Sequence, residues 1–455
     1  MVAQPDSTRQ APGPEGRFLF GKSAAFQRDT LRLLLELQRD YGGIVRLRLG
    51  PYLVHQVTDP SLVKHVLQDR ADNYVRGRFY RRFNLFFGRG MLTTDDDEWR
   101  QRRAVSQPFF THGAVDAAAP LITDSVANLL ERWAAPAAKG EPLDVVPDIM
   151  RLAMGVLSRL LFHVDLRERA DDLLPVVRFA IGTMILTGKL EQVLPSWLPT
   201  RYQRNLRSSR AALNTVMDDV IDSHPGDGDD LVAALLAASD PATGRPWDRR
   251  QIRAELKTHF LAGHETTGCG LAWTLYAIAG HADVQQRLSD EIDEVLGGGT
   301  PAPADLPRLE YLGRVVDESL RLYPPIWLFP RDARHDDELD GYHIPADSTL
   351  LLAPYAAHHD PGRWPDPETF DPDRFCPGRP GPARYTYFPF GGGPRRCIGS
   401  HLARLELQLA VAMIMQRYRL RLSPEHQVIP AALVSLRPLH GIHLTLSDRY
   451  QGVHP

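Results

Sequence analysis

Apolar and polar residues alternate in one short region near the start of the chain and recur at helical spacing over much of the rest. The stretch IVRLRLGPYLVHQV, residues 44–57, alternates around Gly50-Pro51, which predicts a β-hairpin. From about residue 97 to 296, apolar residues recur every three or four positions, which predicts helices. The clearest examples are VANLLERW, DIMRLAMGVLSRLLF and LRSSRAALNTVMDDVI. This pattern is typical of a mostly helical chain with a small β region.

Segments rich in glycine, proline and aspartate interrupt and follow the helical region. Residues 223–230 and 297–307 are polar and rich in these residues, which indicates surface loops. The stretch GYHIPADSTLLLAPY, residues 341–355, predicts a short pair of strands. From 356 to 396 the chain predicts one long irregular segment, and such a segment inside a compact domain usually has a function.

The composition is that of an ordinary globular protein and argues against several classes. Of 455 residues, 43% are apolar and 24% charged, and the net charge of −3 argues against nucleic-acid binding. The length allows two or three ordinary domains or one large domain. Residues 1–16 are polar and rich in proline, which predicts a flexible segment. No signal peptide or membrane anchor is predicted, because no long apolar run occurs. Three cysteines fit a reducing compartment, so we expect a cytoplasmic protein.

The stretch LAGHETTGCG, residues 261–270, begins like the zinc-protease motif H-E-x-x-H. That motif requires a second histidine four residues after His264, one helical turn away, and Gly268 stands there. A zinc ion would lack an essential ligand, so Glu265 and Thr266 must have another role. The stretch lies within a long apolar helical pattern over about residues 248–280.

A second stretch, FPFGGGPRRCIGSHLARLELQLAVAMIMQRY, carries a cysteine from a glycine-rich loop to the start of a long helix. Cys397 would face the positive end of the helix dipole, which together with nearby arginines favours a thiolate. Gly393 and Gly399 permit close backbone approach to a flat, bulky group, and Phe390 can pack against the sulfur or its partner. A thiolate held in this way can bind a metal; the alternative is an ordinary buried cysteine after a turn.

Residues 390–399 resemble the haem-binding signature of the cytochrome P-450 family, F-x-x-G-x-R-x-C-x-G, at every fixed position. The resemblance implies that Cys397 is the axial thiolate ligand of haem iron. It further implies that Arg395 contacts a haem propionate and that Phe390 tunes the thiolate.

Residues 262–267, AGHETT, resemble the oxygen-activation motif of the same family. The resemblance implies that Ala262 and Gly263 leave room over the iron, and that Glu265 and Thr266 relay protons to bound oxygen. A helix C-cap is the alternative for this sequence. We expect His264 to be a polar residue with its hydrogen bonds satisfied on the far side of the helix.

Further motifs match the family in order and spacing. Glu318 and Arg321 in DESLRLYPP resemble its E-x-x-R element, and Arg374 would complete a structural triad that positions Cys397. In the motif around Arg374, Asp373 replaces the usual Glu. The resemblance implies contacts to the haem propionates from three more residues, namely Trp99, Arg103 and Arg331.

Together the motifs imply a fold and an activity. The fold is mainly α, a single large, roughly triangular cytochrome P-450 domain over residues 17–455, with a small β-rich lobe. The activity is that of a monooxygenase with haem b, which inserts one oxygen atom from O₂ into a hydrophobic small molecule by hydroxylation or epoxidation. The alternatives are a peroxide-driven peroxygenase, whose members carry Arg and Pro in place of Glu265 and Thr266, and a non-catalytic haem gas sensor or electron carrier.

Electrons should come from NAD(P)H through separate proteins. Only 58 residues follow Cys397, which is too few for a flavin or iron–sulfur domain. We therefore expect a monomer served by a ferredoxin or flavodoxin with its reductase. Four arginines suggest a basic face for such an acidic partner, namely Arg100, Arg102, Arg396 and Arg404. The alternative is that they are ordinary solvated residues.

The resemblance implies that three regions line a distal substrate pocket. Their candidate residues are mostly apolar, which predicts a hydrophobic substrate such as a terpenoid, polyketide or fatty acyl chain, in bacterial secondary metabolism. His259 lies seven residues before Thr266, on the same helix face, and is either a lone polar contact to substrate or a core histidine. The candidates are Phe79, Phe83, Phe86, Phe260, Leu261, Ala262, Ile326, Trp327, Leu328 and Val434.

Overall fold

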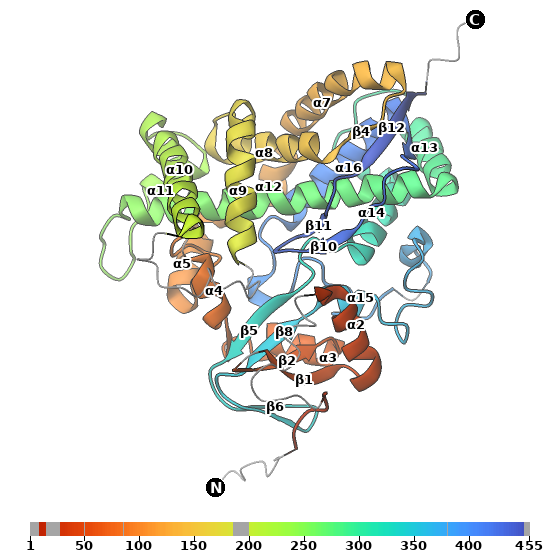
Figure 1. The fold of residues 1–455 in the computed structure, drawn as a ribbon. Helices are drawn as coiled ribbons and strands as arrows, with labels where there is room; N and C mark the ends of the chain where they lie inside the picture. Colours follow the sequence, from red (N-terminus) through yellow and green to blue (C-terminus); the bar gives the residue numbers. More distant parts are fainter. Residues whose placement is uncertain are drawn as a thin grey trace, which may run out of the picture.

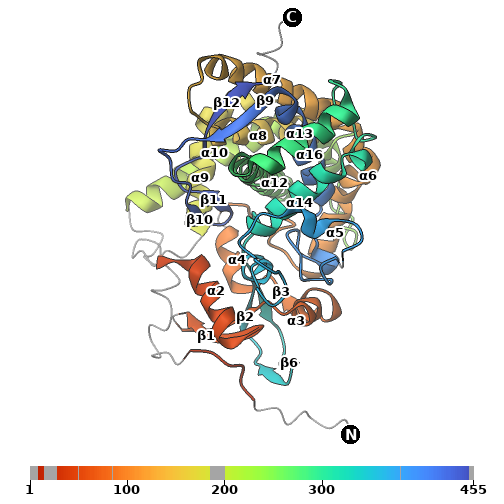
Figure 2. The same ribbon diagram turned by 90° about the vertical axis from the view of Figure 1, so that its right-hand side faces the viewer.

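The computed structural model describes residues 9–14, 28–49, 51–84, 86–184, 200–379 and 381–449. Helices make up most of this part of the chain, and short strands form small sheets. Figures 1 and 2 show the largest sheet below the body of the helices. The predicted class, mainly α with a small β-rich lobe, is confirmed.

The helices predicted between residues 97 and 296 are present, and the predicted loops at 223–230 and 297–307 follow α10 and α13. The described α-helices are α2 (Thr30–Tyr41), α3 (Pro60–Lys64), α4 (Gly77–Phe83), α5 (Asp96–Ser106), α6 (His112–Ala117), α7 (Ala119–Lys139), α8 (Val146–Phe162), α9 (Ala170–Met184), α10 (Arg201–Ser223), α11 (Leu231–Leu236), α12 (Arg249–Gly280), α13 (Ala282–Leu296), α14 (Glu310–Leu322), α15 (Pro354–His358) and α16 (Ser400–Arg417).

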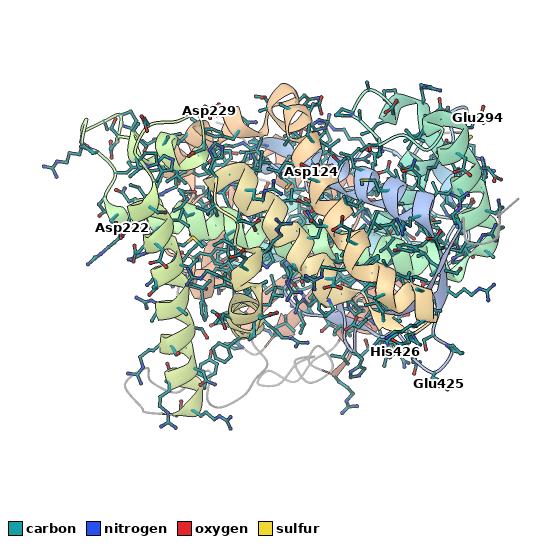
Figure 3. All side chains as sticks on the ribbon, turned by 90° about the horizontal axis from the view of Figure 1, so that it is seen from above. Asp124, Asp222, Asp229, Glu294, Glu425 and His426 are labelled. Carbon is teal, nitrogen blue, oxygen red and sulfur yellow. The ribbon has the colours of Figure 1, made fainter. Side chains whose placement is uncertain are left out.

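The outer helices bury one apolar face and turn their charged residues to solvent, as their sequence period predicts. Figure 3 views the molecule from above, where Asp124, Asp222 and Glu294 lie on α7, α10 and α13; all three are exposed. The apolar faces of these helices close over a shared core that includes Trp133 and Trp273.

Helix α12 runs through the middle of the helical body (Figure 1). A capping box fixes its start, because Asp248 accepts from the backbone N–H of Gln251, whose side chain accepts from the backbone N–H of Asp248. Gly263 lets α8 approach closely, since a Cβ there would lie 2.8 Å from Leu157 Cδ1. The glycine that the sequence assigned to space over the iron therefore also serves helix packing.

The largest sheet begins with the predicted hairpin of β1 (Ile44–Leu49) and β2 (Tyr52–Val57). Its spatial order is β1-β2-β8-β5-β3, with β8 (Thr349–Leu352), β5 (Phe329–Ala333) and β3 (Tyr74–Val75). The strand pair predicted within residues 341–355 is wrong in its pairing. Strand β7 (Tyr342–Ile344) pairs with β6 (Asp337–Leu339), whereas β8, buried at all four positions, requires neighbours on both edges and finds them in β2 and β5.

Two smaller sheets pack against the helical body. One contains β4 (Leu143–Asp144), β12 (His443–Asp448) and β9 (Tyr418–Leu422). The other is the hairpin of β10 (Pro430–Ala432) and β11 (Leu436–Pro438). This hairpin is tied to α12, because Trp273 Nε1 donates a hydrogen bond to the carbonyl of Leu436 at 2.8 Å.

The first 16 residues were predicted to be flexible, and residues 9–14 do not match that prediction. Ala11 is buried, and the backbone N–H of Arg46 donates to the carbonyl of Pro12 at 2.7 Å. The other residues of this segment lie outside the described ranges, and the division into a segment and one domain stays a prediction. No helix in the described part of the chain is long and apolar enough to cross a membrane.

The irregular segment before Cys397 is held by a buried ion pair on α14. Arg321 donates from Nε to Glu318 Oε2 at 2.7 Å, and from Nη1 to the carbonyls of His358 and Pro367 at 2.7 and 2.8 Å. Arg374 donates from Nε to Glu318 Oε1 at 3.1 Å. The predicted triad is thus assembled, and it fixes carbonyl groups that no regular secondary structure satisfies.

We predict that Glu318→Ala lowers the free energy of unfolding by about 3–5 kcal/mol, because it leaves the guanidinium of Arg321 buried without its carboxylate. The matched control is Glu36→Ala, which removes the exposed i,i+4 partner of Arg32 on α2 and should leave stability near the wild-type value. Urea unfolding followed by circular dichroism measures both. Equal midpoints for the two variants would contradict a structural role for the triad.

Candidate functional site

A cavity of about 650 Å³ lies between α12 and the loop that precedes α16. Its wall also includes residues of α4, of the segment after α14 and of the turn between β10 and β11. Cys397 lines one side of the cavity, and Ala262 and Thr266 of α12 line it as well. The two motifs that the sequence singled out therefore meet at one internal space.

The loop that carries Cys397 is built on glycines with left-handed backbone angles. Gly391 and Gly393 have φ values of 67° and 64°, which favour glycine. Gly393 does not line the cavity: a Cβ there would lie 1.7 Å from the carbonyl oxygen of Leu67. The sequence predicted close approach to a flat group at this position, but the close approach is to the protein backbone.

The other predicted loop residues do face the cavity. Phe390 and Gly399 line it, and the backbone N–H of Cys397 donates to the carbonyl of Phe390 at 3.0 Å. A Cβ at Gly399 would lie 3.6 Å from the ring of Phe110, which is ordinary contact. Space alone therefore does not require glycine at position 399.

The surroundings of the Cys397 thiol act on its pKa in opposite directions. Burial raises the pKa above its ordinary value, and this effect is the largest. The backbone N–H of Gly399 and the positive charges of Arg103 and Arg396 oppose it. The amide and the arginines therefore act on the pKa of Cys397 in the direction that the sequence predicted, while desolvation acts against them and is larger. A metal cation bound to the sulfur would supply the missing stabilisation.

The α12 side of the cavity presents a hydroxyl group in a defined position. Thr266 Oγ1 donates to the carbonyl of Ala262 at 2.8 Å, so the hydroxyl proton is engaged and a lone pair of the oxygen faces outward. Thr266 and Ala262 both line the cavity. His264 does not: its Nδ1 bonds to the carbonyl of Phe260 at 2.6 Å, and its Nε2 has no partner among the described residues.

Glu265 reaches the cavity wall but its carboxylate is held from the far side. Ser435 donates to Oε1 at 2.5 Å, and Arg437 Nη2 donates to Oε2 at 2.7 Å. Ser435 lies in the turn before β11 and Arg437 on that strand. Sequence reasoning missed both residues, since nothing in LVSLRP marks them; the ion pair exists because the β10–β11 hairpin folds against α12.

Three guanidinium groups converge at one edge of the cavity. Arg76, Arg331 and Arg395 all line it. Burial and the mutual repulsion of these cations lower the pKa of Arg331 to about 10 and that of Arg395 to about 9. Asp95 accepts from Arg395 Nη2 at 2.7 Å and is the one carboxylate bonded to the cluster within the described ranges. Arg76 was not found from the sequence, because it belongs to no motif.

Trp99 and Arg103 are placed behind this cluster rather than on the cavity wall. The Arg395 guanidinium lies over the Trp99 ring, 4.4 Å from its centroid, and Arg103 donates to the carbonyl of Arg396 at 3.0 Å. Neither Trp99 nor Arg103 lines the cavity. A direct contact of these residues with a propionate stays a prediction; within the structure the two residues support Arg395 and the cysteine loop.

The cavity fits the haem that the resemblance implies. Nη1 of Arg395 and Nε of Arg76 are buried and have no hydrogen-bond partner in the described part of the chain. Three cations with one bonded carboxylate leave positive charge that two propionate groups would neutralise. A thiol on the same cavity supplies a ligand of the kind that haem iron accepts.

Most of the predicted pocket residues line the cavity, and two do not. Phe86 and Phe260 are 1% and 0% exposed and belong to the core instead. Phe260 precedes Ala262 by two positions on α12, about 200° around the helix, so it points away from the cavity. The lining aromatic and aliphatic residues that were missed include Phe87, Phe110 and Leu157. The predicted residues that line the cavity are Phe79, Phe83, Leu261, Ala262, Ile326, Trp327, Leu328 and Val434.

The predicted basic face is only partly present. Arg102 is 2% exposed and forms ion pairs with Glu98 and Glu255, so it is not a surface residue. Arg404 is half-buried and bonded to Asp317. Arg396 is exposed next to Cys397, and Arg100 is exposed but paired with an aspartate on its own helix.

Comparison with known proteins agrees with this geometry. A family model described as Cytochrome P450 matches residues 11–442. Cyclooctatin synthase from Streptomyces melanosporofaciens is 35% identical over 442 residues, 94% of each chain. Cyclooctat-9-en-7-ol 5-monooxygenase from the same organism is 33% identical, over 92% of this chain and 91% of that protein. Pentalenene oxygenase from Streptomyces avermitilis is 30% identical, over 90% of this chain and 92% of that protein.

Proposed function

The chain belongs to the cytochrome P450 family, and we propose that Cys397 is the axial ligand of its haem iron. The enzyme is a monooxygenase that uses haem and O₂, with electrons from NAD(P)H delivered by redox partners. The observation that carries the assignment is the cavity that Cys397 and Thr266 line together. The two other cysteines do not line it: Cys269 is buried within α12, and Cys376 lies in the irregular segment.

One oxygen atom of O₂ enters the substrate and the other leaves as water, which consumes two electrons and two protons. When bound, the haem supplies the reductive activation of O₂. The residues of the chain hold the group: the sulfur of Cys397 binds iron, and Arg76, Arg331 and Arg395 neutralise the propionates. Phe390 and Gly399 line the cavity beside the sulfur and exclude water from it.

We propose that Thr266 donates the protons that O₂ activation consumes. Its hydroxyl lies on the cavity, where a lone pair can accept a hydrogen bond, and its own proton becomes available when the bond to the Ala262 carbonyl is released. Glu265 is the nearest acid along the helix, and its buried carboxylate forms an ion pair with Arg437. Protons that reach Thr266 through Glu265 must pass this ion pair.

The substrate proposed is a hydrophobic small molecule such as a terpenoid, in a bacterial biosynthetic pathway. The wall of the cavity is mainly apolar and aromatic, which suits a lipophilic molecule. The names of two relatives refer to cyclooctat-9-en-7-ol and pentalenene, and this supports a hydrocarbon skeleton over a polyketide or fatty acyl chain.

The alternative functions that the sequence left open receive less support. A peroxygenase would carry Arg and Pro where Glu265 and Thr266 stand. A gas sensor or electron carrier needs no lipophilic cavity beside its haem, and the relatives are named as a synthase and oxygenases.

A monomeric state and a cytoplasmic location are also proposed. Few large apolar residues are exposed in the described part of the chain, which supports a monomer. They are Tyr41, Tyr52, Ile429 and Leu439. Three cysteines in 455 residues support a reducing compartment.

We further propose that the redox partner is a ferredoxin or flavodoxin that docks over Arg396. This arginine is exposed, precedes Cys397 and has no ion pair among the described residues. Arg102 is buried and Arg404 is bonded to Asp317, so neither contributes to the predicted face. Arg396 is the cation that remains to steer an acidic partner.

The role of Thr266 is tested by comparing Thr266→Val with Thr266→Ser. Valine keeps the shape and removes the hydroxyl, so product formation should fall on the order of a hundredfold while haem and substrate still bind. Serine keeps the hydroxyl and should retain most activity. Product per NAD(P)H is measured with a surrogate reductase and a ligand that shifts the haem spin state. Wild-type coupling in Thr266→Val would exclude the role.

The docking face is tested by Arg396→Glu against Arg421→Glu, which makes the same charge change on β9. Arg396→Glu should slow haem reduction by ferredoxin at low ionic strength and flatten its dependence on salt, because steering by charge is screened. Arg421→Glu should behave as wild type. Stopped-flow reduction rates that are independent of salt in the wild type would contradict the proposal.

A further inference from the structure

His259 of α12 presents an unpartnered nitrogen on the wall of the cavity. The side chain lines the cavity and is 5% exposed. Its Nε2 has no hydrogen-bond partner among the described residues. A buried polar atom without a partner costs free energy, so a ligand that satisfies it gains affinity and specificity.

The tautomer of this histidine follows from its other hydrogen bond. Nδ1 lies 2.9 Å from the carbonyl oxygen of Glu255, and a carbonyl only accepts, so Nδ1 carries the proton. Burial lowers the pKa of His259 to about 4, so the ring is neutral near pH 7. Nε2 is therefore a bare acceptor, which can bond to an O–H or N–H group and to no carbonyl or ether.

The ring of His259 is fixed in place. It stacks on Phe110, with the centroids 5.8 Å apart and the planes at 20°. Together with the bond to Glu255, this contact holds the direction of Nε2. The periphery of haem carries no hydrogen-bond donor once its propionates are ionised, so the partner of Nε2 comes from substrate or water.

His259 and His264 lie on the same helix, but only His259 lines the cavity. His264 also bonds through Nδ1 to the carbonyl four residues before it, and its Nε2 is likewise unpartnered among the described residues. His264 is 0% exposed and does not line the cavity. An unpartnered imidazole nitrogen is thus tolerated in this core, and only the one at position 259 can meet a ligand.

We propose that His259 Nε2 accepts a hydrogen bond from a hydroxyl group of the substrate. This inference rests on the proposed monooxygenase function and narrows its substrate to a lipophilic alcohol. Seven residues of helix separate His259 from Thr266, a rise of about 10 Å on nearly the same face. The hydroxyl would therefore be held on the order of 10 Å from the carbon that is oxidised.

A place in a reaction sequence follows from this chemistry. The substrate must already carry a hydroxyl group, so a hydroxylation, a hydration, a carbonyl reduction or an ester hydrolysis supplies it. The product of the present enzyme then carries two oxygen functions on one hydrocarbon skeleton.

The test uses two ligand series in which only the polar group changes. They are 2-adamantanol, 2-adamantanone and adamantane, and 2-dodecanol, 2-dodecanone and dodecane. Spin-state titration of the wild-type holoenzyme should show that the alcohol of at least one series binds about tenfold more tightly than its ketone and its hydrocarbon. Equal affinity for alcohol, ketone and hydrocarbon in both series would overturn the inference.

Two variants assign the preference to one atom. His259→Phe keeps an aromatic ring against Phe110 and removes the acceptor, so the preference for the alcohol should disappear while affinity for the hydrocarbon is unchanged. His264→Phe, off the cavity, should keep the wild-type preference. Haem content and the ferrous–carbon monoxide spectrum check that each variant is folded. If His259→Phe fails to bind haem, the wild-type comparison of alcohol with ketone still decides.

The outcomes separate this inference from the function on which it rests. If no hydrophobic ligand shifts the spin state of the wild-type protein and no oxygenated product forms, the proposed substrate class itself is wrong. Oxygenated products without preference for an alcohol would leave that class intact and reject the role of His259. An alcohol preference that persists in His259→Phe would assign the hydroxyl contact to another residue and overturn the proposal.

Discussion

The buried ion pair between Glu318 and Arg321 is the interaction on which the position of Cys397 depends. Residues 356–396 contain few regular hydrogen-bonded elements, so their carbonyl groups need donors from elsewhere. Arg321 supplies donors to His358, Pro367 and Thr369, while Glu318 accepts from Arg374 and from the backbone of Asp371. These hydrogen bonds hold the irregular segment in place. The cysteine loop follows this segment and lies across the cavity from α12.

Two parts of the cavity wall differ in their charge. The edge with Arg76, Arg331 and Arg395 carries excess positive charge that only an anionic ligand can satisfy. The α12 wall carries neutral or internally paired groups, because Thr266 bonds to the helix backbone and Glu265 is neutralised by Arg437. Haem binding and substrate binding therefore draw on different forces, charge at one edge and apolar burial elsewhere.

The sequence predicted what depends on local pattern and failed where the answer depends on tertiary contacts. The periods of α7, α8, α10 and α12 are local, and these predicted helices are confirmed, as is the helix that follows the cysteine loop. Whether Phe260 faces the cavity or the core, and whether Arg102 meets solvent or Glu255, is decided by neighbouring helices. The same holds for Arg437, which gains its role only because a distant hairpin packs against α12.

The ferrous–carbon monoxide difference spectrum tests the central claim, that Cys397 binds haem iron as a thiolate. The wild-type protein should display the absorption maximum from which the family takes its name. Cys397→Ser should lose that maximum, while Cys269→Ser and Cys376→Ser should keep it, since neither of those cysteines lines the cavity. A Cys397→Ser protein that retains the maximum, or a haem-loaded wild type that lacks it, would contradict the account.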